Sequence, residues 1–215
     1  MDVHDDLKAL TLSDPYVGLM SLPGELRNVI YFLLLFPYLR TIQIFGNMSD
    51  SQLSRSLFRS SVFRINRQIR FEAINFLCST KKIHIHGAMA ASQFFCAINS
   101  FGRESLTNIV LQVDAGYPSS SFYQDECVRL LSSASALERM HLAIDVSALS
   151  RVAGVSTNFI SFLINVKKTC EGMEGVRFSW CVFGTLLSAS ALKDVKAGLG
   201  VGNRLGEGNV LKCVH

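Results

Sequence analysis

Two histidines separated by one residue are the first residues whose types and spacing suggest chemistry. His84 and His86 lie in an alternating stretch, and side chains two residues apart on a strand share one face. Paired imidazoles can bind zinc, but no Cys, Asp or Glu follows them at a familiar ligand spacing. His141, in a later strand pattern, would lie roughly 10 Å away, two strands across at about 4.8 Å each. Because zinc ligands must converge within about 2.3 Å of one ion, we predict neither a metal site nor a cofactor.

His141 also raises the question of hydrolysis. Together with Asp145 and any serine it would make a minimal hydrolase constellation. The sequence has no Gly-x-Ser-x-Gly elbow, no phosphate-binding loop and no paired acidic motif placed for acid–base work. We therefore predict that the protein is not an enzyme. A hydrolase that uses His141 stays as an alternative, and it requires a serine or cysteine within reach of that imidazole.

A basic run in the middle of the chain has two interpretations. A basic stripe can contact nucleic acid, ideally with exposed aromatic side chains beside it. It can also be a solvated helix face whose arginine stems cover apolar surface. The net charge is only +4 over 215 residues, so we favour the solvated face and do not expect nucleic acid as a partner. The run comprises Arg55, Arg59, Arg64, Arg67 and Arg70.

The composition predicts a chain with a substantial buried core. Hydrophobic residues make up 49% and charged residues 18%, which excludes an intrinsically disordered chain. The acidic start does not resemble a secretory signal, and the longest apolar run, residues 29–39, is too short to span a bilayer. We expect an intracellular protein, cytoplasmic or nuclear, with no membrane partner. Its six cysteines form no Cys-x-x-Cys pair, and we expect reduced, mostly buried thiols.

Strand and helix patterns alternate from residue 80 onward. The strand patterns cover residues 80–86, 106–113, 137–144 and 173–180, and the helix patterns cover 88–101, 121–134, 157–170 and 186–199. This alternation predicts a mostly parallel sheet with helical crossovers. Because the strands alternate apolar and polar residues, we expect helices on only one sheet face. That favours a leucine-rich-repeat-like arc, and the alternative is a small three-layer sandwich.

Aligned in register, these strands would present a polar face able to recognise a peptide or protein segment. We predict a first row of His84, Val110, His141 and Arg177, and a second row of His86, Gln112, Ala143 and Ser179. Asp114, Asp145 and Cys181 fall near the carboxyl ends, where open parallel sheets usually bind ligands. At the opposite end we place Lys82, Asn108 and Arg139. The predicted recognition residues are His84, His86, Gln112, Asp114, Arg139, His141, Asp145 and Arg177. A merely solvated face is the alternative.

The N-terminal third contains an apolar helix pattern. Pro23 suits the first helical position, and Glu25 suits the positive end of the helix dipole. Apolar residues then recur at helical spacing, at Leu26, Ile30, Leu33 and Leu34, until Pro37 ends the helix. A short strand at residues 40–45 and a second helical stretch at 51–77 follow.

Two blocks in this region carry a family resemblance. Residues 22–31 are Leu-Pro-Gly-Glu-Leu-Arg-Asn-Val-Ile-Tyr, and residues 64–73 are Arg-Ile-Asn-Arg-Gln-Ile-Arg-Phe-Glu-Ala. The ordered pair resembles a fungal F-box-like family. Its members open with Leu-Pro-x-Glu-Leu-Arg-Asn-x-Ile-Tyr and carry a later Arg-Gln-Ile core before Glu-Ala. Ser79 and Thr80 match the end of the second block, so the resemblance covers about forty residues.

The resemblance implies a protein–protein interaction adaptor. In true F-box proteins the helical module docks on a Skp-type linker of a cullin ubiquitin ligase, and the rest of the chain recognises a substrate protein. Apolar anchors on one helix face make this helix-in-groove recognition. The residues that the resemblance assigns to docking are Leu22, Pro23, Leu26 and Ile30, with Ile65 and Ile69 holding the helices together and adding contacts. For any one of these apolar residues, core packing is the alternative.

The predicted fold class is α+β, with F-box-like helices packed on a leucine-rich-repeat-like arc. We predict an acidic arm at 1–18, an F-box-like module with a short strand insertion at 19–80, a strand–helix recognition domain at 81–200 and a glycine-rich flexible tail at 201–215. Unlike an ordinary F-box, the two blocks are separated by residues 36–56. The alternative function is therefore a binding or structural module of the same fold without ubiquitin-ligase association.

Overall fold

A computed structural model describes residues 18–46, 61–116, 119–147, 156–183, 195–197 and 199. The chain divides into two compact units, 1–37 and 38–215. The first unit contains a 3-10 turn, η1 (Leu19–Ser21), and the helix α1 (Gly24–Leu34). The predicted arm at 1–18, apart from Gly18, and the predicted tail at 201–215 lie outside the described residues.

Local interactions explain where α1 begins and ends. Pro23 is the N-cap, and Glu25 lies in the first turn, where the helix dipole favours a carboxylate. The Arg27 guanidinium donates a hydrogen bond back to the Leu22 carbonyl (2.5 Å), which fixes the residue before the N-cap. At the other end the Leu35 N–H donates to the Tyr31 carbonyl (2.7 Å). The helix thus ends before Pro37, as the sequence predicts.

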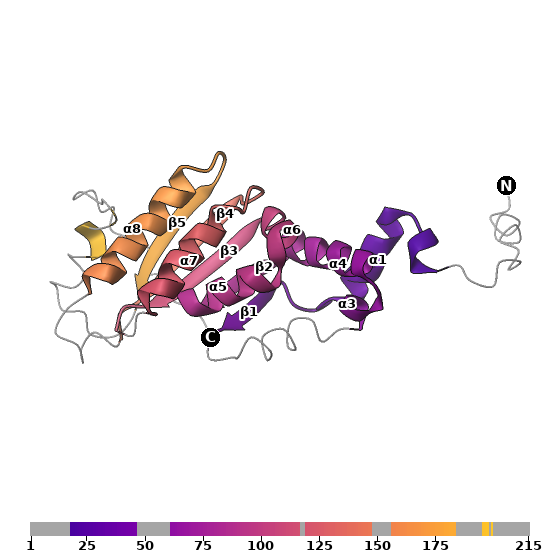
Figure 1. Cartoon of the computed structure of the whole chain (residues 1–215), viewed down its shortest axis with the longest axis horizontal. Helices are drawn as coiled ribbons and strands as arrows, with labels where there is room; N and C mark the ends of the chain where they lie inside the picture. Colours follow the sequence, from indigo (N-terminus) through magenta and orange to yellow (C-terminus); the bar gives the residue numbers. More distant parts are fainter. Residues whose placement is uncertain are drawn as a thin grey trace, which may run out of the picture. The chain divides into compact units, whose positions relative to one another are not determined.

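The second unit is built on one parallel sheet. Its strands are β1 (Thr41–Phe45), β2 (Lys82–His86), β3 (Asn108–Asp114), β4 (Arg139–Asp145) and β5 (Arg177–Phe183). All neighbours pair in parallel, and the spatial order β1-β2-β3-β4-β5 follows the chain (Figure 1). The helices are α3 (Val62–Ile65), α4 (Arg67–Thr80), α5 (Ala88–Ala97), α6 (Asn99–Glu104), α7 (Ser121–Leu131) and α8 (Thr157–Glu171).

Strand alternation separates a covered face from an open face. Ile83, Ile85, Ile109, Leu111 and Leu142 are buried on the covered face, against which α5, α7 and α8 lie side by side (Figure 1). Most residues between them carry polar side chains that are half-buried or exposed, whereas Val110 and Ala143 are apolar and buried. Within the described part of the chain, no helix covers that second face. The prediction of one parallel sheet is confirmed, and the described helices that pack on it lie on one face. The likeness to leucine-rich-repeat arcs stays a prediction.

The strand at 41–45 corrects the predicted organisation. We expected an insertion within the helical module, but β1 pairs with β2 over its whole length, with Gln43 in register with His84. It is therefore the first strand of the sheet, and α3 and α4 form the crossover to the second. The units accordingly divide after Pro37 rather than after residue 80. Local pattern alone does not reveal this, because the pairing joins strands about forty residues apart.

The register of the last strand is also corrected. We aligned Arg177 with His141, but Ser179 lies opposite His141, and Arg177 lies opposite Arg139. The error is a shift of two residues, which leaves each side chain on its predicted face but moves it to a different row. A period-two pattern looks the same after such a shift. Of the predicted helix at 186–199, only 195–197 are described as helical.

Candidate functional site

The open face of the sheet forms four rows of side chains across the strands. Its amino-end row consists of Thr41, Lys82, Asn108, Arg139 and Arg177. Next come Gln43, His84, Val110, His141 and Ser179, followed by Phe45, His86, Gln112, Ala143 and Cys181. The carboxyl-end row holds Asp114, Asp145 and Phe183. All eight predicted recognition residues thus lie on one face.

Charge on this face is sorted along the strands. The three cations, Lys82, Arg139 and Arg177, are exposed in the amino-end row, and the two carboxylates, Asp114 and Asp145, lie in the carboxyl-end row. Asp145 is six residues beyond Arg139 on β4, which is roughly 20 Å along a strand. The two rows between them hold no carboxylate, lysine or arginine. The face is therefore bipolar, with a neutral middle.

Stacked rings form part of the neutral middle. Phe45 stacks on His86 with ring centroids 4.3 Å apart, and His86 stacks on His84 at 4.4 Å. The His84 Nε2 and the Gln112 Oε1 are 3.2 Å apart, a hydrogen bond in which the imidazole donates to the amide oxygen. The His86 Nε2 is buried and has no hydrogen-bond partner among the described residues. An aromatic platform thus occupies the β1–β2 side of the face.

The three histidines of this face are biased toward the neutral form. Burial lowers the pKa of His86, and the neighbouring His84 lowers it further. Burial also lowers the pKa of His84, with Gln112 opposing and Lys82 reinforcing the shift. For His141, burial is again the main cause of a lowered pKa, followed by the positive charges of Lys82 and His84. The charge at the centre of the face is thus close to zero at neutral pH.

His141 is held by two groups from β5. Its Nδ1 lies 2.9 Å from the Ser179 Oγ, and its Nε2 lies 3.3 Å from the Cys181 Sγ. Either neutral tautomer satisfies both contacts, because the serine hydroxyl and the cysteine thiol can each donate or accept a hydrogen bond. The hydrolase alternative required a serine or cysteine within reach of His141, and that condition is met. Its predicted acid is misplaced, however, because Asp145 lies two rows away along β4.

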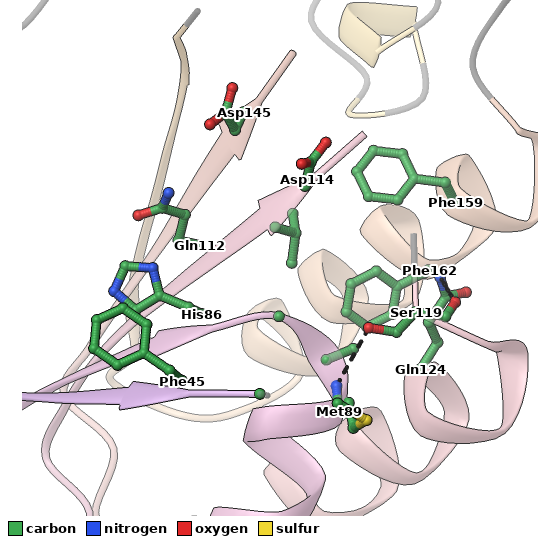
Figure 2. A pocket seen from close by; sticks show the side chains of 14 residues that line it. Phe45, His86, Met89, Gln112, Asp114, Ser119, Gln124, Asp145, Phe159 and Phe162 are labelled. Atoms are coloured by element: carbon green, nitrogen blue, oxygen red, sulfur yellow. Dashed lines mark hydrogen bonds between the residues drawn. The ribbon is translucent and has the colours of Figure 1, made fainter. Parts of the chain in front are cut away.

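A pocket of about 460 Å³ opens at the carboxyl ends of the first four strands (Figure 2). The strand ends contribute Phe45, His86, Gln112, Asp114 and Asp145, and α8 contributes Phe159 and Phe162. Gly87 joins β2 directly to α5, with φ at 94°, and its N–H donates to the Gln112 carbonyl (2.7 Å). That tight turn brings the start of α5 to the pocket wall. Sequence reasoning placed ligands at these strand ends but missed the phenylalanines of α8.

The two pocket carboxylates are held in the same way. The Asp114 Oδ1 accepts a hydrogen bond from the Gly116 N–H (2.8 Å), and the Asp145 Oδ1 accepts one from the Ser147 N–H (2.9 Å). Each aspartate therefore closes a turn just after its strand. On the opposite wall the Gln124 amide donates to the Ser119 carbonyl (2.9 Å), and the Ser119 Oγ accepts from the Met89 N–H (3.4 Å; Figure 2). The pocket thus combines aromatic walls with two fixed carboxylates.

A second candidate surface lies on α1, in the other unit. Leu26, Val29 and Leu33 have 51%, 54% and 60% of their surface exposed, and Pro23 is exposed as well. At 100° per residue these three side chains share one face of the helix, whereas the buried Tyr31 points away from it. Leu22 and Ile30 are half-buried. The expected alternative of core packing therefore does not hold for Leu26.

The second sequence block separates into one exposed and one buried apolar residue. Ile65, at the end of α3, is 57% exposed, whereas Ile69 of α4 is 1% exposed. Ile69 is placed by its own N–H, which donates to the side chain of the N-cap Asn66 (2.8 Å). We predicted that both isoleucines hold the helices together and add docking contacts. The burial of Ile69 agrees with the packing role, but a docking contact from Ile69 is wrong, because almost none of its surface is exposed.

The basic run is partly within the described chain. Arg64, Arg67 and Arg70 are exposed, whereas Arg55 and Arg59 lie outside the described residues. The Arg67 guanidinium lies 5.3 Å from the centre of the Phe71 ring, and the Arg70 Nε donates to the Phe63 carbonyl (2.7 Å). The first is a cation–π contact, and the second satisfies a backbone carbonyl, so both guanidinium groups contact the helices α3 and α4.

Comparison with protein-family models, with curated proteins and with solved structures finds no match to this chain. Among the residues that the structure describes, no helix is long and apolar enough to cross a membrane. Over the same residues, no group of three or more His, Cys, Asp or Glu side chains is arranged to hold a metal ion.

Proposed function

We propose that this protein is an F-box-like adaptor. In this proposal α1 docks on a Skp-type linker of a cullin-type ubiquitin ligase, and the open face of the sheet binds the protein to be modified. The ordered pair of blocks at residues 22–31 and 64–73 is the sequence support. The observation that carries the proposal is the exposed apolar face of α1, formed by Leu26, Val29 and Leu33.

The free-energy argument for docking is direct. Large apolar side chains gathered on one exposed helix face mark a partner surface, because leaving them in water is unfavourable. Covering the exposed half of each of three such side chains in a groove would contribute about 1 kcal/mol apiece. The helix buries Tyr31 on another face. The packing of Tyr31 therefore does not use the exposed leucines. The proposal involves no catalytic step, cofactor or nucleic acid.

Co-purification of the full chain with a Skp-type linker tests the docking half. We expect the wild-type chain to retain the linker, and the pair Leu26→Asp with Ile30→Asp to lose it while keeping its circular dichroism spectrum. Asn28→Asp adds a carboxylate to an exposed polar position of the same helix and should retain the linker. Failure of the wild type to associate, or association unchanged in the folded Leu26 and Ile30 variant, would refute ligase assembly.

A specific observation favours a second candidate, a binding module without a ligase link. The two blocks that resemble the F-box family belong to different compact units, because the residues between them contain β1, the first strand of the sheet. An ordinary F-box is one tight helical arrangement. This candidate predicts a partner captured by the open face, no association with a linker, and no effect of the α1 substitutions on that capture.

A further inference from the structure

We propose that the open face of the sheet binds an extended polypeptide segment with a basic residue and an acidic residue about six positions apart. The basic side chain enters the pocket at Asp114 and Asp145, and the acidic side chain reaches Arg139 and Arg177. This names the partner chemistry of the recognition half of the proposed function, on which it rests. It does not depend on α1.

Charge complementarity carries the first step. The cationic and anionic rows are separated by six strand residues, roughly 20 Å. An extended segment lying along the strands advances by about 3.3 Å per residue, so side chains six positions apart span the same distance. A segment bound with its two charges in the opposite order would place like charges against each other at both ends. The face therefore disfavours such segments.

The pocket supplies the second step, because its walls match a long basic side chain rather than a small cation. Phe159 and Phe162, both nearly fully buried, line the side formed by α8, and Phe45 stacked on His86 lines the side formed by the strands. Lysine and arginine have an aliphatic stem that packs on such rings and a charged head that pairs with carboxylates. A volume of about 460 Å³ has room for one such side chain with accompanying water.

The neutral middle supplies the third step. With the pKa values of all three histidines lowered, the two central rows carry little charge at neutral pH. The stacked rings of Phe45, His86 and His84 offer an uncharged surface to the residues between the charged ends. A segment with uncharged residues between its two charges therefore fits the face along its whole length.

Selection from an immobilised library of random ten-residue peptides tests the proposal without a known ligand. We expect the full-length wild-type chain to enrich peptides with Lys or Arg and an Asp or Glu five to seven positions apart, by about fivefold over unselected peptides. The double variant Asp114→Asn with Asp145→Asn should lose the basic preference and keep the acidic one. The variant Arg139→Gln with Arg177→Gln should do the reverse. No enrichment by the wild type, or the same enrichment by both variants, would overturn the proposal.

Two control variants distinguish recognition of a segment by this face from nonspecific charge effects and from linker docking. Asp125→Asn with Glu174→Gln removes two exposed carboxylates outside the pocket and should leave the enrichment unchanged. Leu26→Asp should also leave it unchanged, so a failure of linker docking is distinguished from a failure of segment recognition. If a second copy of this chain occupied the face, sedimentation would show a dimer that the Asp114 and Asp145 variant disrupts. That result would replace the partner segment and overturn the proposal.

Discussion

Asp114 and Asp145 lie directly opposite each other at the ends of two neighbouring strands, and each closes its turn by accepting a backbone N–H two residues later. The register places the two carboxylates side by side at the carboxyl ends of the strands, and the two hydrogen bonds fix how the carboxylates point. Because an amide oxygen accepts the same hydrogen bond, the charge and the turn can be separated by substitution.

Asp145→Asn should leave stability unchanged within about 0.5 kcal/mol, whereas Asp145→Ala should lower it by about 0.5–1.5 kcal/mol. The asparagine oxygen can still accept from the Ser147 N–H, and alanine cannot. Urea unfolding of the two variants and the wild type measures the difference. Equal stability of the alanine and asparagine variants would show that this hydrogen bond contributes nothing to the turn.

The neutral histidines make stability depend on pH. Each folded-state pKa is lowered from about 6.5, so the unfolded chain takes up protons first as the pH falls below that value. Stability from this source is fully present above about pH 6.5 and declines as the pH falls through the window below it. We expect the urea concentration at the unfolding midpoint to be lower at pH 5.5 than at pH 7.

His86→Phe should reduce that decline. Phenylalanine keeps a ring against Phe45, removes the buried Nε2 for which the described residues offer no partner, and takes up no proton. The matched substitution His141→Phe should also reduce the pH dependence, but it loses the contacts with Ser179 and Cys181 and should lower stability at pH 7. An identical pH profile for the wild type and His86→Phe would contradict the burial of a neutral imidazole.

Much of the second unit was predictable from sequence because its strands are short and its alternation is regular. The alternating pattern at residues 80–86, and the three similar patterns that follow it, predicted strands and the face that each strand buries. This works because every second residue of a strand with one buried face is apolar. Pattern did not reveal that residues 41–45 pair with β2, because a lone alternating stretch does not identify its partner. Nor did it fix the register of β5, where a shift of two residues preserves every apolar position.

The residues of the candidate site were likewise predictable only in part. His84, Gln112 and Asp145 were placed on one face by counting residues along strands, and the face is as predicted. The contact of His141 with Ser179 and Cys181 depends on the β5 register and was therefore missed. Phe159 and Phe162 were missed as pocket residues because helix periodicity marks them only as apolar.

The five described cysteines should differ sharply in reactivity. Burial raises the pKa of Cys78, Cys127 and Cys170 to about 12, so these thiols have almost no thiolate at neutral pH. Cys96 is exposed, and Cys181 is partly exposed beside His141. Brief treatment of the native protein with a maleimide, followed by mass spectrometry, should label Cys96 and Cys181 and spare the three buried thiols.

The same labelling tests the hydrolase alternative. If His141 takes the thiol proton of Cys181, the rate of labelling at that residue should fall in His141→Phe while the rate at Cys96 is unchanged. A rate at Cys181 that is no faster than at Cys96 and is insensitive to His141→Phe would argue against an activated nucleophile. Labelling of Cys78 as fast as Cys96 would contradict the described core.

Gly87→Ala should destabilise the second unit by about 1–3 kcal/mol. Gly87 has φ 94° and ψ 154°, a conformation that side-chain-bearing residues rarely adopt, although an added Cβ would have room. At Gly24 an added Cβ would meet only the Arg27 guanidinium, at 4.0 Å, and φ is not positive, so Gly24→Ala is the control and should not destabilise. Urea unfolding distinguishes the two. An unchanged midpoint for Gly87→Ala would mean that the β2–α5 turn is not held as described.

Docking through α1 is the central claim, and calorimetric titration of a Skp-type linker into the full chain tests it most directly. The wild type and Asn28→Asp should bind the linker with the same Kd. Leu33→Asp, at the most exposed leucine of the helix, should weaken binding by about tenfold or more while the protein stays folded. No binding by the wild type, or equal binding by Leu33→Asp and Asn28→Asp, would contradict an adaptor that docks through this helix.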